Sequence, residues 1–564
     1  MDNTLTVFLI FVAAFLVTAA VYGRYQKKAI YRRFEARFRK DFGIIPSKEI
    51  PLERYVKIPA YYLRHRKDDQ IDDITWNDLN LDDVFERIDN TQSAAGEEYL
   101  YYLLRTPDAG NNELITDEII RYFEDPSSQD VRVRLMLALK LLGHTGKYSL
   151  YEYLDLLDNL GERPLWPHVA AALMPFASFA VMLADVRIGS LLLIASVAYS
   201  FVSYFKSKRE MEPYIVSFRY LLRMIDAGEE ILKVDCPVLK RSYDELSSGL
   251  KELSGFKRGS FLLTYDTQTA SSGNPLDILL DYLRILFHLD LIKFSLMLKT
   301  VREKADRVDR VLTVLGSIDT VICIAGFRLS LPCWCVPEFT EDDAPFTARD
   351  MYHPLLPDPV GNSITADTPV LLTGSNASRK STFLKAAALS ALLAQTVCTV
   401  CASSYRAPRY RIYSSMALRD DIDSGESYFI VEIRSLKRIL DATARADGER
   451  PVICCIDEVL RGTNTIERIA ASAEILKCFS ERKVMCFAAT HDLELASILE
   501  GSFTNYHFEE EIKDGDVVFS YQLKDGKATT RNAIRLLSAL GYDEDIVKAA
   551  GDRASRFMES GVWS

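Results

Sequence analysis

The sequence predicts an α/β domain at its carboxyl-terminal end, preceded by an all-α region that carries transmembrane helices. Three observations lead to this prediction. A short apolar run at 370–372 leads through a small-residue loop into an apolar helix that begins near Lys380, which is the order strand, loop, helix. Apolar residues recur at helical spacing through much of the chain before residue 340. Two long apolar blocks interrupt that helical pattern.

The totals limit the kind of protein. A chain of 564 residues is too long for one ordinary core, so we expect two or three domains. The net charge of −11 excludes a protein that is basic overall, although it allows a local basic groove. The 10 cysteines are scattered and mostly lie in apolar runs, which is typical of buried thiols in a reducing compartment. Cys333 and Cys335 are close in sequence, as are Cys398 and Cys401, but neither pair has a partner at zinc spacing.

The first apolar block, at 5–22, predicts an amino-terminal transmembrane anchor over residues 1–24. Basic residues follow the block, beginning with Arg24 and Lys27. A cleaved signal peptide would have its charges before the apolar run. The excess of lysine and arginine after the span places the following chain in the cytoplasm.

The second block predicts a transmembrane helical hairpin over 165–205, with a tight turn at 185–187. Basic residues at 206–209 place both ends of the hairpin in the cytoplasm. Together with the anchor, this predicts a multi-pass protein of the cell membrane with three spans and a cytoplasmic carboxyl-terminal domain. Prolines and a glycine interrupt the block, and the alternative is a buried helical hairpin in a soluble core.

The rest of the chain before the α/β domain predicts a helical core in two parts, 25–164 and 206–340. The acidic stretch 71–85 is expected to be exposed, and a turn near Asn90 leads into a helix that ends before Pro107. No catalytic cluster is evident in this region, which favours a scaffold or lever. A change in composition near Thr340 predicts that 341–564 forms the last domain.

The loop after residue 372 is the first candidate site, because its backbone N–H groups and the following helix N-terminus can hold phosphates. Lys380 would reach the β- and γ-phosphates, and the Ser381 hydroxyl would bind Mg²⁺. The predicted nucleotide-binding residues in this loop are Gly374, Ser375, Asn376, Ala377, Ser378, Arg379, Lys380, Ser381 and Thr382.

One loop position departs from the usual pattern of Gly, four residues and Gly-Lys-Ser/Thr. Arg379 stands where the second glycine belongs. A side chain there can strain the turn or crowd the phosphates, or it can lend them its charge. We expect the Arg379 side chain to point outward, and its presence to weaken nucleotide binding.

The residues downstream supply the chemistry of ATP hydrolysis. An apolar strand at 451–456 ends in Asp457 and Glu458, of which Asp457 would hold Mg²⁺ and Glu458 would orient the attacking water. A second strand, at 484–488, is followed by His491, which suits a sensor of the γ-phosphate. We therefore predict Glu458 and His491 as catalytic residues, and Ser381 and Asp457 as magnesium ligands.

These motifs together resemble the MutS family of mismatch-repair ATPases, which are relatives of the ABC ATPases. The strings that carry the resemblance are SGESYFIVE at 424–432, DEVLRGTNT at 457–465 and ATH at 489–491. The resemblance is strong over 340–555 and weak over 70–340. It implies a P-loop NTPase fold, ATP and Mg²⁺ as cofactors, and DNA as a partner. It also implies a homodimer in which the turn containing Ser424, Gly425 and Ser427 completes the partner chain's site.

The sequence also departs from that family. No counterpart of its mismatch-reading domain, DNA-clamp insertion or nuclease domain is evident, and the predicted hairpin interrupts the helical core. We expect a membrane-anchored ATPase that couples ATP hydrolysis to the binding of mismatched or structured DNA. One alternative is a nucleotide-regulated membrane scaffold with weak or no hydrolysis. Another is an ABC-type transport ATPase, which should show an LSGGQ-like signature and about six spans.

Overall fold

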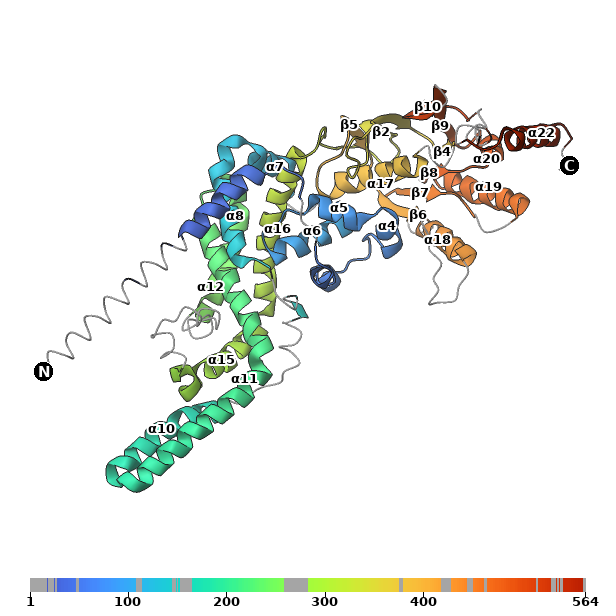
Figure 1. The fold of residues 1–564 in the computed structure, drawn as a ribbon. Coiled ribbons are helices and arrows are strands. Elements are labelled where there is room, and N and C mark those ends of the chain that lie inside the picture. Colours follow the sequence, from blue (N-terminus) through green and yellow to red (C-terminus); the bar gives the residue numbers. More distant parts are fainter. Residues whose placement is uncertain are drawn as a thin grey trace. The chain divides into compact units, whose positions relative to one another are not determined.

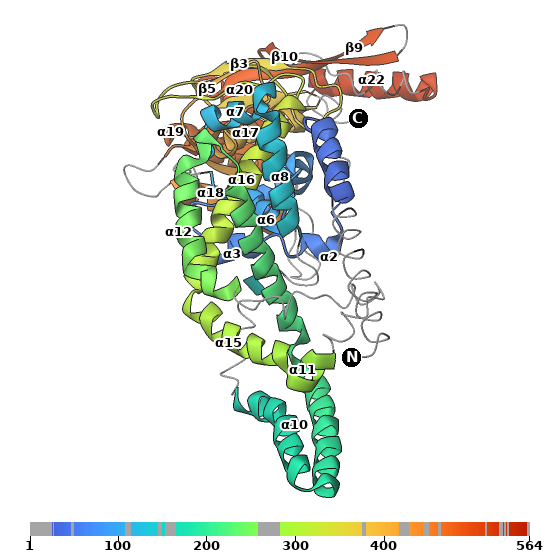
Figure 2. The same ribbon diagram turned by 90° about the vertical axis from the view of Figure 1, so that its left-hand side faces the viewer.

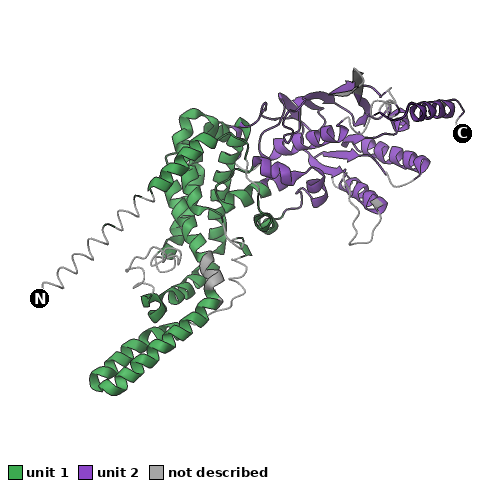
Figure 3. Cartoon of the chain, viewed as in Figure 1, with its two compact units in different colours: residues 1–66, 89–102, 118–329 green, residues 67–88, 103–117, 330–564 purple. Residues whose placement is uncertain are grey.

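The chain folds into two compact units, shown in different colours in Figure 3. Unit 1 comprises residues 1–66, 89–102 and 118–329, and unit 2 comprises residues 67–88, 103–117 and 330–564. Two segments from within 25–164 are therefore part of the same unit as the carboxyl-terminal region. The computed structural model describes residues 18, 25, 28–46, 50–107, 114–144, 149, 151–152, 165–257, 282–374, 379–416, 428–443, 450–460, 464–513, 516–528, 534, 537 and 541–560. Apart from residue 18, the anchor predicted over 1–24 lies outside these residues.

Unit 1 is helical throughout its described part (Figure 1). This confirms an α-rich region before the carboxyl-terminal α/β region. Its α-helices are α2 (Leu52–Tyr55), α3 (Ala60–Arg64), α6 (Ala94–Arg105), α7 (Asp117–Glu124), α8 (Gln129–Leu142), α10 (Trp166–Ala184), α11 (Val186–Ile231), α12 (Lys240–Lys257), α15 (Leu289–Glu303) and α16 (Ala305–Leu329).

Helix α16 forms the centre of unit 1 and also fixes the start of α6. The buried Asp319 carboxylate of α16 accepts hydrogen bonds from the backbone N–H groups of Gln92 (3.0 Å) and Ser93 (2.8 Å), and from the Ser93 hydroxyl (2.6 Å). Asp319 thus satisfies amide groups at the amino-terminal end of α6 from a distant part of the chain. A Cβ atom on Gly96 would lie 2.4 Å from Asp319 Oδ2, so this close approach requires glycine.

Helix α10 and the first half of α11 form the predicted apolar hairpin, and they lie side by side in Figure 2. Asp185 begins α11 and accepts hydrogen bonds from the N–H groups of Arg187 and Ile188, which explains the tight turn. At Gly189 an added Cβ would lie 2.1 Å from the Cα atom of Met182, so the helices approach closely here.

Three described helices are long and apolar enough to cross a membrane: α10, α11 over Val186–Arg209, and α16. They differ in burial, since 22% of the apolar window is buried in α10 and in α11, against 89% in α16. Helix α16 is therefore a core helix, whereas the hairpin leaves its apolar side chains uncovered. The exposed apolar residues of the hairpin include Trp166, Leu173, Met174, Phe176, Phe179, Leu183, Val186, Ile188, Leu191, Leu192, Ile194, Val202 and Phe205.

Unit 2 is built around two sheets within the described part of the chain. The larger has the order β10-β9-β4-β8-β7-β6, in which β10 is antiparallel to β9 and the other pairs are parallel. The smaller has the order β1-β5-β2-β3. The strands are β1 (Glu338–Phe339), β2 (Phe346–Met351), β3 (Asn362–Ala366), β4 (Val370–Thr373), β5 (Ser404–Ala407), β6 (Arg411–Ser415), β7 (Val452–Asp457), β8 (Met485–Ala489), β9 (Thr504–Lys513) and β10 (Asp516–Asp525).

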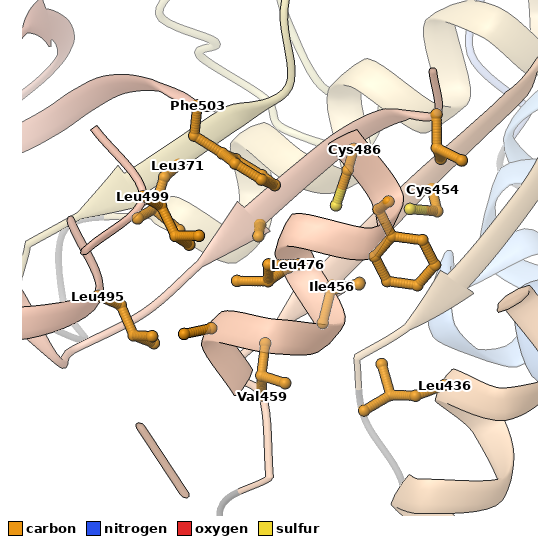
Figure 4. Close-up of a cluster of buried hydrophobic side chains, with 14 of the residues drawn as sticks. Leu371, Leu436, Cys454, Ile456, Val459, Leu476, Cys486, Leu495, Leu499 and Phe503 are labelled. Carbon is orange, nitrogen blue, oxygen red and sulfur yellow. The ribbon is translucent and has the colours of Figure 1, made fainter. Parts of the chain in front are cut away.

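Helices flank the larger sheet and close its core, which confirms a mixed α/β carboxyl-terminal region. The helices of unit 2 include α4 (Asp73–Asp78), α5 (Leu81–Ile88), α17 (Lys380–Thr396), α18 (Tyr428–Thr443), α19 (Thr465–Glu481), α20 (Leu493–Ile498) and α22 (Glu544–Ser560), of which α18, α19 and α20 contribute to this core. Figure 4 shows how Leu371, Ile456 and Cys486 of the strands meet Leu476 of α19 and Leu495 of α20. The central strands are continuous apolar runs because both of their faces are buried.

The acidic stretch 71–85 is not exposed as expected. Trp76 and Phe85 are buried, whereas Asp73, Asp82 and Asp83 are exposed. The Asp78 carboxylate accepts hydrogen bonds from the Ser414 hydroxyl (2.7 Å) and from the N–H of Met416 (2.9 Å), next to β6. The expectation was wrong because α4 and α5 are amphipathic, with their apolar side chains turned into unit 2. They cover the edge of the larger sheet at β6, where an open strand would otherwise present unpaired backbone groups.

Candidate nucleotide site

The topology of the larger sheet brings three predicted site residues to the carboxyl ends of its strands. They are Lys380, Glu458 and His491. Strand β8 lies between β4 and β7, and all three are parallel. The segments that follow them therefore emerge together at the carboxyl end of the sheet, where open α/β sheets bind ligands. The N–H of Thr490 donates to the Leu372 carbonyl, and the N–H of Glu458 donates to the Ala489 carbonyl, both at 2.9 Å. These bonds extend the strand pairing up to the site.

Lys380, His491 and Glu458 form a continuous polar group at this edge. Lys380 Nζ donates to the Gly374 carbonyl oxygen at 2.7 Å and lies 3.4 Å from Nε2 of His491. The same Nε2 lies 2.9 Å from Oε1 of Glu458. Lys380 is only 3% exposed, and a buried ammonium needs polar partners of this kind. The structure thus brings together the predicted phosphate-binding lysine and both predicted catalytic residues.

Arg379 occupies the turn that leads into α17. Its backbone is left-handed, with φ 66° and ψ 27°, a conformation that glycine adopts without strain. Its carbonyl accepts the N–H of Phe383 at 3.0 Å, which begins the helical bonding of α17. Its guanidinium lies 3.8 Å from the centre of the Tyr521 ring, on β10.

Ser381 and Asp457 supply oxygen donors of the type that Mg²⁺ prefers. Ser381 is in the first turn of α17, followed by Thr382, and Asp457 is the last residue of β7. All three are half-buried, so their side chains are accessible from the carboxyl edge of the sheet. A hydroxyl and a carboxylate that follow neighbouring parts of one sheet edge fit a Mg²⁺ ion bound with a triphosphate.

The sequence of this region was compared with known proteins. A family model described as MutS domain V matches residues 370–558, which include Lys380, Asp457, Glu458 and His491. Residues 370–558 therefore resemble domain V of the MutS family, which is the family that the motifs predict.

Three DNA mismatch repair proteins match parts of the chain. The DNA mismatch repair protein MutS of Thermus thermophilus is 32% identical over 183 residues, which is 32% of this chain and 22% of the relative. The DNA mismatch repair protein MutS 2 of Haloarcula marismortui is 30% identical over 281 residues, 45% of this chain and 29% of the relative. The DNA mismatch repair protein MutS of Aquifex pyrophilus is 30% identical over 263 residues, 44% of this chain and 30% of the relative. The chain therefore spans less than a third of the length of these relatives.

Glu432 is a residue of the candidate site whose role the sequence did not indicate. It lies on α18, is buried, and its Oε1 accepts a hydrogen bond from the N–H of Leu460 at 2.5 Å. Glu458 and Leu460 both have left-handed backbones, with φ 60° each. Such conformations persist only where the surroundings hold them, so Glu432 fixes the turn that presents Glu458. Glu432 ends the string at 424–432, and this was the available signal.

A second supporting pair holds the segment that carries His491. Arg468 of α19 donates from Nε to Oδ2 of Asp492 (3.0 Å) and from an Nη atom to Oδ1 (2.7 Å). This two-pronged geometry fixes both the position and the orientation of the carboxylate. The N–H of Asp492 also donates to the Thr490 hydroxyl at 3.0 Å. The pair joins residues far apart in the chain, and no local sequence pattern announces it.

Several predicted nucleotide-binding residues lie outside the described residues. They are Ser375, Asn376, Ala377 and Ser378 of the loop, and Ser424, Gly425 and Ser427 of the turn before α18.

The two cysteine pairs noted in the sequence meet at one place in the fold. Cys335 and Val400 exchange backbone hydrogen bonds of 3.0 Å, which brings 333–335 beside 398–401. Within the described ranges, no group of three or more His, Cys, Asp or Glu side chains is arranged to hold a metal ion. Cys401 is buried and stays a thiol, since burial raises its pKa to about 12.

Proposed function

We propose that this MutS-like chain binds and hydrolyses ATP at the carboxyl edge of the larger sheet. The observation that carries the proposal is the group formed by the buried Lys380 with His491 and Glu458, which come from segments that follow three neighbouring strands. A buried lysine at the start of a helix offers a positive charge where the helix already favours anions. A carboxylate and an imidazole beside it can handle the water that attacks the terminal phosphate.

Each residue has a role that follows from its position. Lys380 would exchange its bond to the Gly374 carbonyl for bonds to phosphate oxygens. Glu458 would orient and polarise the attacking water, and His491, which contacts both side chains, would report phosphate occupancy to Glu458. Ser381 and Asp457 would hold Mg²⁺, which neutralises charge on the phosphates.

The proposed assembly is a homodimer in which Ser424, Gly425 and Ser427 of one chain face the nucleotide of the other. Helix α18 begins at Tyr428, directly after this turn, and its Glu432 binds the turn that carries Glu458. Engagement of the turn by a partner's nucleotide would therefore reach Glu458 through the first residues of α18. ATP binding would close the dimer and hydrolysis would reopen it.

The test of the ATPase proposal is Mg²⁺-dependent phosphate release by the full-length chain in detergent. We expect Lys380→Ala to abolish both ATP binding and turnover. Lys437→Ala is the matched control, because Lys437 is an exposed lysine of α18 that pairs with Asp441 at 2.9 Å. Equal turnover by both variants would refute the proposed site. Nucleotide binding without turnover by the unmodified chain would instead favour a nucleotide-regulated scaffold.

DNA is the proposed macromolecular partner. The proposal is supported by the similarity of the chain to DNA mismatch repair proteins. We expect mismatched or branched duplexes to raise the rate of ATP hydrolysis above that seen with a perfect duplex. An equal rate with and without every DNA form would remove DNA from the proposal.

The apolar hairpin supports a further part of the proposal, a multi-pass location in the cell membrane with unit 2 in the cytoplasm. An uncovered apolar surface of this extent is costly in water, and a bilayer would bury it. Trp166 is 71% exposed at the start of α10, a position typical of side chains at a membrane interface. Extraction of membranes at high pH tests this: release of the chain into the aqueous fraction would contradict a spanning hairpin.

A further inference from the structure

The Arg379 turn raises a question that the proposed ATPase leaves open. A phosphate-binding loop normally has glycine at this position, because the left-handed backbone costs a residue with a side chain on the order of 1 kcal/mol. Arg379 adopts that backbone, with φ 66°. A compensating contact must then stabilise the turn, or α17 would not begin where Lys380 requires it.

The structure supplies that contact in Tyr521. The Arg379 guanidinium lies over the Tyr521 ring at 3.8 Å, well within the range of a cation–π interaction. Both side chains are half-buried, so water screens the pair only in part. Both also line a cavity of about 30 Å³, together with Asn362 and Phe383.

Tyr521 is itself held by a built feature of the sheet. The pairing of β10 with β9 shifts register between Phe519 and Leu523, and Tyr521 lies in this bulge with φ 53°. The Asn362 side chain clamps the bulge from β3. Its Nδ2 donates to the Tyr521 carbonyl (3.1 Å), and its Oδ1 accepts the N–H of Leu523 (2.7 Å).

We propose that Tyr521 is a positioning residue for the nucleotide-binding loop, which acts by holding Arg379 in the conformation that glycine would adopt unaided. The Asn362 hydrogen bonds orient the bulge that carries the Tyr521 ring. The ring contacts the Arg379 guanidinium, and this contact stabilises the turn at the start of α17. The nucleotide-binding part of this inference depends on the proposed ATPase function. The turn itself can be tested without nucleotide.

The decisive experiment is a double-mutant cycle on the full-length chain in detergent, read by titration with a fluorescent ATP analogue. In the Arg379 background, Tyr521→Ala should weaken binding by about three- to thirtyfold, the range of a partly buried cation–π contact. In the Arg379→Gly background, the same change should leave the affinity within about twofold, because glycine needs no support. Tyr521→Phe keeps the ring and should bind like the unmodified chain. An equal loss in both backgrounds, or no loss in either, would overturn the proposal.

Hydrogen exchange without nucleotide separates this inference from the ATPase proposal. The N–H of Phe383, which donates to the Arg379 carbonyl, should exchange about three- to thirtyfold faster in Tyr521→Ala than in the unmodified chain. The Arg379→Gly background should cancel that difference. If the unmodified chain bound no ATP analogue, the ATPase proposal would fail while this exchange result still decided the role of Tyr521. Unchanged exchange at Phe383 would refute the positioning role.

Discussion

Nε2 of His491 lies 2.9 Å from Oε1 of Glu458, and the two residues follow neighbouring parallel strands. The contact places the His491 imidazole between Lys380 and the Glu458 carboxylate, which is proposed to act on water. An imidazole held in this way can align the carboxylate and can exchange that contact for one with a phosphate oxygen. His491 would thereby link the phosphate-binding turn to the group that acts on water.

Replacement of Glu458 by Gln should leave ATP binding intact and reduce turnover at least ~10²-fold, if the carboxylate acts as a general base. The amide keeps the size of the side chain, and Asp457 and Ser381 are unchanged. Single-turnover hydrolysis and analogue titration measure the two effects separately. Glu474→Gln, on α19, serves as the matched control. Unchanged turnover would remove Glu458 from its proposed role.

The ion pair between Arg468 and Asp492 should matter for turnover more than for binding. Arg468→Met removes both hydrogen bonds to the carboxylate and lets the His491 segment shift, which we expect to lower kcat by about tenfold or more. Arg468→Lys should restore little, because lysine cannot reproduce the two-pronged contact. Arg482→Met, in the residue that follows α19, is the control. A Lys variant with full activity would show that charge alone suffices.

His353 gives unit 2 a defined dependence on pH. Burial, together with the nearby Lys385, lowers its pKa to about 4, whereas the unfolded value is about 6.5. The folded state favours the neutral ring. The contribution of His353 to the free energy of unfolding is therefore complete above pH 6.5 and is lost as the pH falls towards 4. Between pH 7.5 and 5, the free energy of unfolding should decrease by about 2 kcal/mol.

Hydrogen exchange at the Tyr352 amide, which donates to the Cys401 carbonyl at 3.0 Å, reports this loss. After correction for intrinsic exchange rates, the free energy of opening should decrease in the unmodified chain as the pH is lowered. It should decrease much less in His353→Asn. The same pH dependence in both proteins would assign the effect to other groups.

The orientation of the hairpin can be tested by labelling single introduced cysteines in intact cells. The lysine and arginine bias predicts that the turn at 185–187 is outside and that the residues after the second span are inside. A cysteine at Val186 should react with a membrane-impermeant reagent, and one at Lys208 should not. The opposite pattern would reverse the topology.

The sequence was sufficient to predict those parts of the fold that depend on local pattern. Strand β4, the start of α17 near Lys380 and the strand before Asp457 follow from apolar runs and motif spacing. The approach of Glu458 and His491 follows less directly. It requires β8 to lie between β4 and β7, and strand order depends on long-range packing.

Other parts were beyond reach because they depend on partners distant in the chain. The carboxylates of 71–85 suggested a solvated surface, yet every third or fourth residue is apolar and faces unit 2. Glu432 and Arg468 each act on one partner segment through hydrogen bonds. Such contacts produce no periodic pattern in the sequence. At Arg379 the missing glycine was visible in the sequence, but the contact of its guanidinium with the Tyr521 ring was not.

The packing of α4 against β6 makes the carboxyl-terminal unit discontinuous along the chain. Residues 67–88 are synthesised long before their binding surface on β6 exists, and the whole apolar hairpin is translated in between. Thr75 and Asp78 must therefore remain without their hydrogen-bonding partner Ser414 while the hairpin is made. A fragment that starts at residue 330 would lack α4 and α5 altogether. Its strand β6 would then have an open edge that could pair with other molecules. Unit 2 can thus complete its folding only when residues 67–88, which are synthesised early, pack against its later strands. Proteolytic cleavage at a single site cannot release this unit intact.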